Sequence, residues 1–367
     1  MLIGICGGIY AGKNTITDYL VDKHGFKRIS LNPSIVPGND RNWSLPYPIK
    51  TRGVSSYTFD SVDELLAHVT RHWRENYVTT ELWTEDVAVA LLHRPFFLLV
   101  SVDAPLMMRW KRSPMWAGRQ SNNRDSPDNL FLLYDDFEKY SARVGYLHIA
   151  QRAHLHILNN TDSLPALHAQ LGALDLPSES RLRPSWDQYF MQLASLAASR
   201  SNCMKRRVGA VLVRDRRVVS TGYNGTPRGI RNCNAGGCPR CNGVSSNDAE
   251  GKGNLSSSSG HALSTCLCLH AEENALLEAG RDRLDRRGEG EGSHCTLYSD
   301  TCPCLTCAVK IAQVGIAEVV YSKSYSMDST TAAVLGEAGV ELRQFSPISG
   351  GLVDVRAATG GRVESWG

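Results

Sequence analysis

The stretches HAEEN (residues 270–274) and CPCLTC (residues 302–307) decide how the second half of this chain folds. Together they read H-x-E followed by P-C-x-x-C. One imidazole and two thiolates, from His270, Cys304 and Cys307, can hold Zn²⁺ on three corners of a tetrahedron and leave the fourth for water. The metal lowers the pKa of that water, and a carboxylate that is not a ligand must then carry protons. Glu272 is the candidate for that task, so these residue types predict a catalytic zinc site.

This combined pattern is the signature of zinc-dependent nucleobase deaminases. A purely structural zinc site is the alternative, and a lone C-x-x-C would favour it. A structural site needs no proton shuttle, however, and the glutamate argues for catalysis. We expect both stretches at helix N-termini, where the helix dipole favours thiolates.

The composition is that of a soluble globular protein with two domains. The 367 residues are 42% hydrophobic and 21% charged, with a formal charge of +3. Lys205-Arg206-Arg207 is the main basic cluster, which gives little support for nucleic-acid binding. No apolar stretch approaches the roughly 18 residues of a membrane span, and the apolar opening lacks the basic n-region of a signal peptide. We therefore expect a cytoplasmic or nuclear protein that is not secreted.

Strands alternate with helices over residues 1–175, which predicts a parallel sheet. Residues 2–6, 96–102 and 154–158 read as its strands, with helices from residue 13 and over 164–171. We interpret 176–184 as a linker and 185–346 as a second domain of order α-β-β-α-β-α-β-α-β. Within it, residues 244–259 form a polar insertion that we expect to be flexible, and 347–367 a loose tail.

A glycine-rich loop follows the first strand. Residues 7–14 (GGIYAGKN) nearly fit the phosphate loop G-x-x-x-x-G-K-[ST], in the required strand-to-helix context. Gly7, Gly12 and Lys13 match that loop. Asn14 stands where a hydroxyl should bind Mg²⁺, and Thr15 comes one place late. This predicts a degenerate phosphate loop.

A second group of cysteines lies between the glycine-rich loop and the CPCLTC stretch. Ten of the eleven cysteines follow residue 200, which suggests metal binding rather than disulfides. Cys238 and Cys241 have the knuckle spacing of a zinc site. A structural zinc ion with four thiolate ligands could combine this pair with two of four further cysteines, which are Cys203, Cys233, Cys266 and Cys268. The alternative is that all six are free thiols.

Four strings in the C-terminal half, SNCMKRRVGAVLV, STGYNGTPRGI, CLHAEENALLEAGR and DTCPCLTC, resemble the deoxycytidylate (dCMP) deaminases in their fungal two-domain form. The resemblance covers about residues 184–345. It implies a three-layer αβα cytidine-deaminase fold with a five-stranded mixed sheet. It also implies conversion of dCMP to dUMP and ammonia, which supplies dUMP for thymidylate synthesis.

Residue roles follow from the same resemblance. His270, Cys304 and Cys307 correspond to the zinc ligands and Glu272 to the proton shuttle. Asn224 corresponds to a contact with the nucleoside sugar. Substrate or effector binding is implied for the remaining candidates, which are Tyr223, Gly225, Arg207, Ala271, Arg281 and Tyr325. Members of the family are commonly homo-hexamers, activated by dCTP and inhibited by dTTP with Mg²⁺.

The N-terminal strings FFLLVSVDAPLMMRWKR and HILNNTDSLPALHAQL resemble dephospho-coenzyme A kinase and nucleoside monophosphate kinases. We therefore expect a P-loop kinase-like domain without kinase activity. Three other functions stay open at this stage. They are a polynucleotide deaminase, a free-nucleoside deaminase, and a kinase or nucleotide-binding regulator whose zinc half is only a scaffold.

Overall fold

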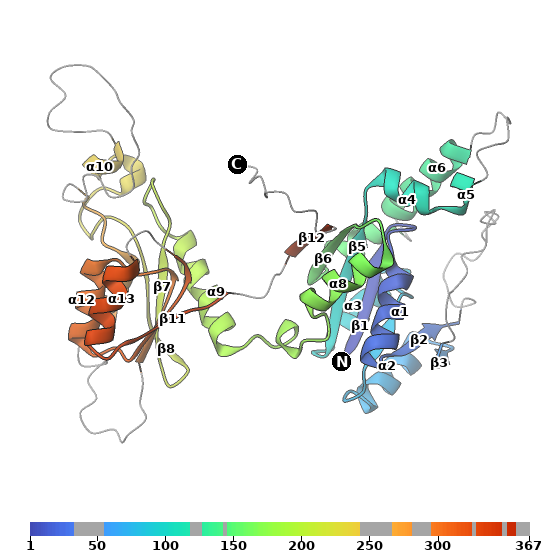
Figure 1. The fold of residues 1–367 in the computed structure, drawn as a ribbon, viewed down its shortest axis with the longest axis horizontal. Coiled ribbons are helices and arrows are strands. Elements are labelled where there is room, and N and C mark those ends of the chain that lie inside the picture. The colour runs from blue at the N-terminus through green and yellow to red at the C-terminus, as the bar shows by residue number, and fades with distance from the viewer. Residues whose placement is uncertain are drawn as a thin grey trace, which may run out of the picture. The chain divides into compact units, whose positions relative to one another are not determined.

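The computed structural model describes residues 1–32, 55–117, 127–141, 145–242, 266–280, 295–324, 328–346 and 351–356. The chain divides into two compact units. Unit 1 comprises Met1–Arg183 with Ser349–Gly367, and unit 2 comprises Pro184–Ile348. Each unit is an α/β body with its own sheet (Figure 1). Among the described residues, no helix is long and apolar enough to cross a membrane.

Unit 1 alternates strands and helices along most of its length. Its elements are β1 (Leu2–Gly7), α1 (Lys13–His24), β2 (Lys27–Leu31), β3 (Tyr57–Phe59), α2 (Val62–Arg71), β4 (Tyr77–Thr79), α3 (Glu85–Leu92), β5 (Phe97–Asp103), α4 (Leu106–Arg112), α5 (Pro114–Ala117), α6 (Pro127–Tyr140), α7 (Tyr146–Ala150), β6 (Leu155–Asn160), α8 (Leu164–Leu174), the 3₁₀ turn η3 (Glu179–Arg181) and β12 (Gly351–Arg356).

The sheet of unit 1 has seven strands in the order β12-β6-β5-β1-β4-β2-β3, and the paired strands all run parallel. Strand β1 is buried along its whole length, as the centre of a sheet covered on both faces requires. Ile3 and Ile5 pack into one apolar core and Leu2 and Cys6 into the other, because alternate side chains point to opposite faces. The parallel sheet predicted from the alternation of strands and helices is confirmed.

Two boundaries differ from the sequence-based expectation. Residues 351–356, which we expected in a loose tail, form β12 and pair in parallel with β6, from Gly351 opposite Leu155 to Arg356 opposite Asn160. Pairing between segments so far apart in the chain leaves no local signal. Leu176, which we expected to open the linker, is buried in the core of unit 1. The stretch joining the two units therefore starts later than predicted.

Unit 2 follows the predicted order of elements, with two short additions. Its elements are α9 (Trp186–Ser199), β7 (Gly209–Arg214), β8 (Arg217–Tyr223), the 3₁₀ turn η4 (Cys233–Ala235), α10 (Pro239–Asn242), α11 (Ala271–Ala279), β9 (Cys295–Thr301), α12 (Leu305–Val314), β10 (Glu318–Lys323), α13 (Asp328–Glu337) and β11 (Glu341–Gln344). The insertion predicted at 244–259 lies outside the described residues.

The sheet of unit 2 is mixed and five-stranded, in the order β11-β10-β9-β7-β8. Strand β7 pairs antiparallel with both β8 and β9, and β10 pairs in parallel with both β9 and β11. The β7–β8 hairpin turns at Asp215 and Arg216, both with positive φ, which fits a two-residue turn. Helix α9 covers one face, and α12 and α13 cover the other (Figure 1). The predicted three-layer αβα sandwich with a five-stranded mixed sheet is confirmed.

A glycine lets helix α11 dock closely on β8. A Cβ at Gly222 would lie 2.0 Å from the carbonyl oxygen of Ala271 and 2.5 Å from the nitrogen of Ala275. Ala271 and Ala275 are fully buried beneath that contact. The first turn of α11, which carries the HAEEN stretch, is thereby held against the end of β8.

Candidate active site

Helix N-termini position three of the predicted metal ligands. His270 is the N-cap residue of α11, and Cys304 is the N-cap residue of α12. Cys307 lies in the first turn of α12 and is buried. Because the first backbone N–H groups of a helix lack intrahelical partners, the N-termini of α11 and α12 both favour negatively charged groups. The expected placement of both stretches at helix starts is confirmed.

The three ligand atoms converge on one point. Cys304 Sγ lies 3.3 Å from His270 Nδ1, and Cys307 Sγ lies 3.4 Å from the same atom. The three atoms all lie within 4.8 Å of one another. Donors on one tetrahedral zinc ion stand about 3.5 Å apart, given bond lengths near 2.0–2.3 Å. The imidazole and the two thiols therefore fit a single zinc ion.

The charge distribution in this group suits a cation. A hydrogen bond from the Cys307 thiol, together with His270, lowers the pKa of Cys304 to about 3. The same bond and burial raise the pKa of Cys307. The hydrogen bond to Cys304 raises the pKa of His270. The two thiols thus share a proton that a bound cation would displace.

Glu272 lies beside the three ligand atoms and inside the protein. Its side chain is 4% exposed. Its Oε1 accepts a hydrogen bond from Ser299 Oγ at 3.3 Å, and its Oε2 lies 3.8 Å from Cys307 Sγ. Burial raises the pKa of this carboxyl, although the hydrogen bond from Ser299 opposes the shift. A raised pKa suits a carboxyl that must both accept and return a proton.

Asn224 holds a loop rather than standing free. Its Oδ1 accepts hydrogen bonds from the Ser201 hydroxyl at 2.7 Å and the Val208 amide at 2.8 Å. Its Nδ2 donates to the Arg206 carbonyl at 2.8 Å. The side chain is 8% exposed and so fixes the path of residues 201–208 against the end of β8. A contact with the nucleoside sugar stays a prediction.

The other predicted binding residues lie around this end of β8. The Tyr223 carbonyl accepts a hydrogen bond from Asn274 Nδ2 at 3.0 Å, which ties α11 to the strand. Gly225 exchanges both backbone hydrogen bonds with Leu269, the residue before His270. Arg207 is exposed on the loop that Asn224 holds. Arg281 and Tyr325 lie outside the described residues.

Six of the other C-terminal cysteines form one group. Cys233, Cys238 and Cys268 are buried together, with the thiols of Cys203, Cys241 and Cys266 packed against them. Two sets of three sulfur atoms lie within 4.8 Å of one another, and Cys233 belongs to both. Backbone amides lower the pKa of Cys238 to about 7, although burial opposes this. This donor set could hold metal apart from the His270 site.

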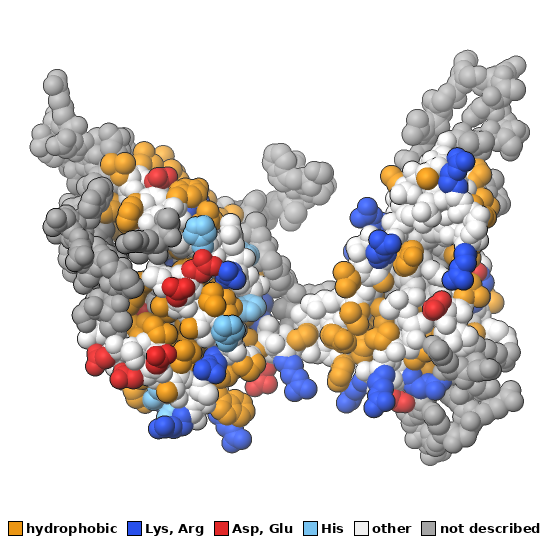
Figure 2. All heavy atoms as spheres, turned by 180° about the vertical axis from the view of Figure 1, so that it is seen from behind, with side chains coloured by type: hydrophobic (Ala, Val, Ile, Leu, Met, Phe, Trp, Pro, Cys, Tyr) orange, Lys and Arg blue, Asp and Glu red, His pale blue; other side chains and the backbone are white. Residues whose placement is uncertain are grey.

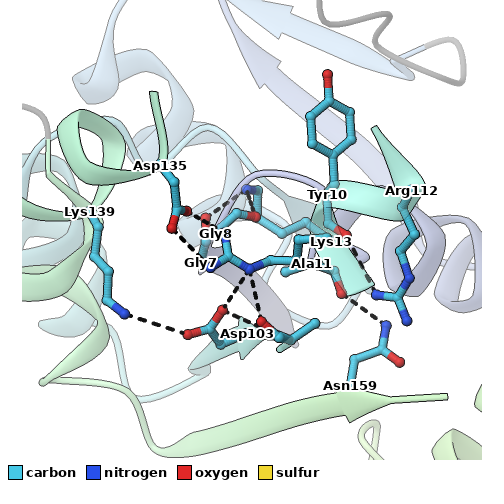
Figure 3. A network of polar contacts seen from close by, with 12 residues as sticks. Gly7, Gly8, Tyr10, Ala11, Lys13, Asp103, Arg112, Asp135, Lys139 and Asn159 are labelled. Carbon is cyan, nitrogen blue, oxygen red and sulfur yellow. Dashed lines mark hydrogen bonds and ion pairs between the residues drawn. The ribbon is translucent and has the colours of Figure 1, made fainter. Parts of the chain in front are cut away.

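The glycine-rich loop of unit 1 encloses the Lys13 side chain (Figure 3). Lys13 Nζ donates to the carbonyl oxygens of Gly7 at 2.7 Å and Gly8 at 2.9 Å, and burial lowers its pKa. A Cβ at Gly7 would lie 1.8 Å from the Val102 carbonyl oxygen, so only glycine fits where β1 ends beside β5. Gly12 is the N-cap residue of α1 with φ 111°. Asn14 and Thr15 lie in the first turn of α1.

A charged network lies beside this loop. Arg109 is buried, donates to the Ala104 carbonyl at 2.8 Å and pairs with Asp103 and Asp135. Arg112 Nη2 donates to the Thr161 carbonyl at 2.7 Å. Asn159 Nδ2 donates to the Ala11 carbonyl at 2.9 Å, as Figure 3 shows. The loop itself is held by Asn159 and by Arg112, whose Nη1 donates to the Tyr10 carbonyl at 3.5 Å.

Sequence reasoning missed three polar residues around the catalytic group. Ser299 bonds Glu272, Ser201 bonds both the carbonyl and the side chain of Asn224, and Asn274 bonds Tyr223. Only Asn274 stood inside a recognisable motif, as the last residue of HAEEN. The two serines carry no spacing signal, because their partners are far away in the sequence.

Comparison with known proteins places the chain in a family. The model of the cytidine and deoxycytidylate deaminase zinc-binding region matches residues 184–323. The deoxycytidylate deaminase of Schizosaccharomyces pombe is 47% identical over 347 residues, covering 94% of this chain and 97% of that protein. The chain belongs to the deoxycytidylate deaminase family. The deoxycytidylate deaminase of Saccharomyces cerevisiae is 39% identical over 94% of this chain and 97% of its own length.

Some members of the family are much shorter. The deoxycytidylate deaminase of Mycobacterium phage D29 is 44% identical over 141 residues, which are 38% of this chain and 97% of the phage protein. The zinc-binding region matched by the family model lies wholly within unit 2 and contains His270, Glu272, Cys304 and Cys307. The two yeast proteins, in contrast, align along nearly the whole of both units.

Proposed function

We propose that this chain hydrolyses dCMP to dUMP and ammonia. The observation that carries the proposal is the convergence of His270 Nδ1, Cys304 Sγ and Cys307 Sγ beside the buried carboxyl of Glu272. Family membership supports dCMP as the substrate, because the relatives that align along nearly the whole chain are named deoxycytidylate deaminases.

The chain's own residues divide the work between metal binding and proton transfer. His270, Cys304 and Cys307 would hold zinc, which when bound activates a water molecule for attack on C4 of the cytosine ring. Glu272 would accept a proton from that water, pass one to the ring nitrogen and deliver one to the departing ammonia. Its raised pKa matches this exchange. Ser299 would hold the carboxyl in place between these transfers.

Substrate recognition is proposed for the loop around Asn224. Asn224 would contact the deoxyribose, with Tyr223, Gly225 and Ala271 around it. The exposed Arg207 is a candidate for the 5′-phosphate. Arg281 and Tyr325 share that proposal on the family resemblance alone.

Regulation and assembly are also proposed from the family resemblance. The chain would form a homo-oligomer, a hexamer in common members, that dCTP activates and dTTP with Mg²⁺ inhibits. Its product would supply thymidylate synthesis.

For unit 1 we propose a P-loop kinase-like fold that binds a nucleotide phosphate without transferring it. The buried ammonium of Lys13 and the start of α1 support phosphate binding. Asn14 replaces the hydroxyl that would ligate Mg²⁺, which argues against phosphoryl transfer. For the second cysteine group we propose at least one structural zinc ion.

The alternative deaminase substrates receive less support. On the face seen in Figure 2, described Lys and Arg side chains stand singly or in small groups, with apolar and uncharged atoms between them. A polynucleotide deaminase would need a broad basic groove with stacking aromatics. A mere zinc scaffold would not need Glu272.

Replacing Glu272 tests the proposal. Glu272→Gln should abolish conversion of dCMP to dUMP while retaining the fold and the zinc content. Glu273→Gln is the matched control, because Glu273, in the same turn, forms a partly exposed ion pair with Lys310 at 2.5 Å. It should keep activity within about tenfold of the unmutated chain, since exposed ion pairs contribute little. Retained turnover in Glu272→Gln would refute the assigned role.

A further inference from the structure

Six cysteines from three separate segments of unit 2 pack together. Cys203 follows α9, Cys233 lies in η4, Cys238 precedes α10, Cys241 lies within α10, and Cys266 and Cys268 precede α11. The buried cluster that these segments share contains only cysteines. A small region without an aliphatic core needs another source of stability, and metal–thiolate bonds are a common one.

The thiols form two overlapping sets. Cys203, Cys233 and Cys241 make one set, and Cys233, Cys238 and Cys268 make the other. In each set the sulfur atoms lie within 4.8 Å of one another, a range that includes the separation of about 3.8 Å between two sulfurs on one zinc ion. Cys233 belongs to both sets and is fully buried between them.

Each set has a further thiol beside it. The thiol of Cys203 lies beside those of Cys241 and Cys268, so Cys268 adjoins the first set as well as belonging to the second. The thiol of Cys266 lies beside that of Cys238 in the second set. Cys268 is therefore the candidate for a fourth donor to the first set, and Cys266 for a fourth donor to the second.

Backbone amides face two of these sulfur atoms. The amides of Lys205 and Arg206, two and three residues after Cys203, point at its thiol. The amide of Leu267 points likewise at the thiol of Cys238. Hydrogen bonds of this kind orient metal-bound thiolates and stabilise their charge. They are an observation independent of the sulfur distances.

We propose that the six cysteines hold two zinc ions in one binuclear cluster, bridged by the thiolates of Cys233 and Cys268. Cys203 and Cys241 complete the tetrahedron of one ion, and Cys238 and Cys266 complete that of the other. One four-thiolate ion would leave two of these adjacent thiols unused. This inference extends the proposed structural zinc site and does not depend on the chemistry at Glu272.

The cluster would brace the catalytic histidine. Cys268 precedes Leu269, whose amide donates to the Gly225 carbonyl at 2.8 Å and whose carbonyl accepts from the Gly225 amide at 3.2 Å. His270 follows directly. A bridging thiolate at Cys268 would therefore fix the approach to α11 from one side, while the end of β8 fixes it from the other.

Metal analysis of the purified unmutated chain tests the proposal first. We expect about three zinc ions per chain, one at His270 and two in the cluster. Cys304→Ala should reduce the count to about two. Cys295→Ala, a buried cysteine of β9 outside both groups, is the control and should leave it at about three. A count of about two in the unmutated chain would overturn the binuclear cluster, and a count of about one would exclude any structural zinc.

The bridge itself has a separate test. After exchange with ¹¹³Cd, the chain should give two cluster resonances that are split by each other through the shared thiolates. Two unsplit resonances, or one, would overturn the bridged arrangement. Cys233→Ser should lose both cluster ions and Cys266→Ser no more than one; equal losses in two folded variants would contradict bridging by Cys233. Where a variant does not fold, the spectrum of the unmutated chain decides.

These outcomes are distinct from those that concern deamination. An inactive chain with about three ions would refute the proposed reaction and leave the cluster intact. An active chain with about two ions would refute the binuclear cluster alone.

Discussion

The hydroxyl of Ser299 lies 3.3 Å from Oε1 of Glu272, and both side chains are buried. Ser299 stands on β9 and Glu272 in the first turn of α11, so the sheet and the catalytic helix meet at this bond. The carboxyl is thereby held beside the three proposed metal-ligand atoms of His270, Cys304 and Cys307.

Removing this hydrogen bond should slow catalysis without removing the metal. We expect Ser299→Ala to lower kcat for dCMP about tenfold, because one buried hydrogen bond to a carboxyl contributes about 1.5 kcal/mol. Zinc content should not change. Ser220→Ala is the matched control: that buried hydroxyl donates at 2.7 Å to the carbonyl of Ala275, three residues further along the same helix, and does not bond Glu272. An equal loss of kcat in both variants would mean that Ser299 acts only through the fold.

Asn224 should matter for stability and for substrate affinity together. Asn224→Ala leaves the Val208 amide and the Arg206 carbonyl without their partner, which should cost about 2 kcal/mol of unfolding free energy. The displaced loop should also raise KM for dCMP. Denaturant unfolding and initial rates measure the two effects. Asn232→Ala, at an exposed Asn202–Asn232 hydrogen bond, should change stability by less than about 0.5 kcal/mol; a similar loss there would contradict this account.

Much of this site followed from the sequence, for a physical reason. His270, Glu272, Cys304 and Cys307 lie in two short stretches whose spacing is fixed by helix starts, and the structure confirms that the helices begin there. Ser299 and Ser201 act through partners distant in sequence, and an isolated serine has no distinctive spacing. Strand β12 was not predicted for the same reason, because its partner β6 lies in the first half of the chain and far from it in sequence.

An ion-pair network should make the stability of unit 2 depend on pH. Hydrogen bonds from Arg343, at 2.7 Å and 3.1 Å, and then from Tyr298 lower the pKa of Asp187 below its ordinary value of 3.8. A depressed carboxyl pKa contributes stability that is fully present above the unfolded pKa and is lost as pH falls through the folded one. Asp187→Asn should therefore cost about 1 kcal/mol near pH 6, because the pair is partly exposed.

The difference in unfolding free energy between Asp187→Asn and the unmutated chain should shrink from pH 5 toward pH 3. Urea unfolding at each pH measures it, and the comparison cancels effects common to both chains. A difference that stays constant over this range would show that the ionised carboxyl of Asp187 is not what stabilises the network.

The glycine-rich loop of unit 1 makes a prediction about nucleotide binding. Lys13→Ala should weaken ATP binding at least about tenfold, since a charged hydrogen bond to phosphate contributes about 1.5–3 kcal/mol. Calorimetric titration measures the affinity. Lys23→Ala, an exposed lysine in the last turn of α1, is the control and should bind as the unmutated chain does. No binding of ATP to the unmutated chain, or equal binding by both variants, would contradict the proposed phosphate site.

The most direct test of the central claim compares ammonia release from dCMP and from deoxycytidine, with Glu272→Gln as the blank. If the chain is a nucleotide deaminase, kcat/KM should favour dCMP by at least about 100-fold, because a site built to bind the 5′-phosphate rejects a substrate that lacks it. Equal turnover of the two substrates, or release from neither, would contradict the assignment.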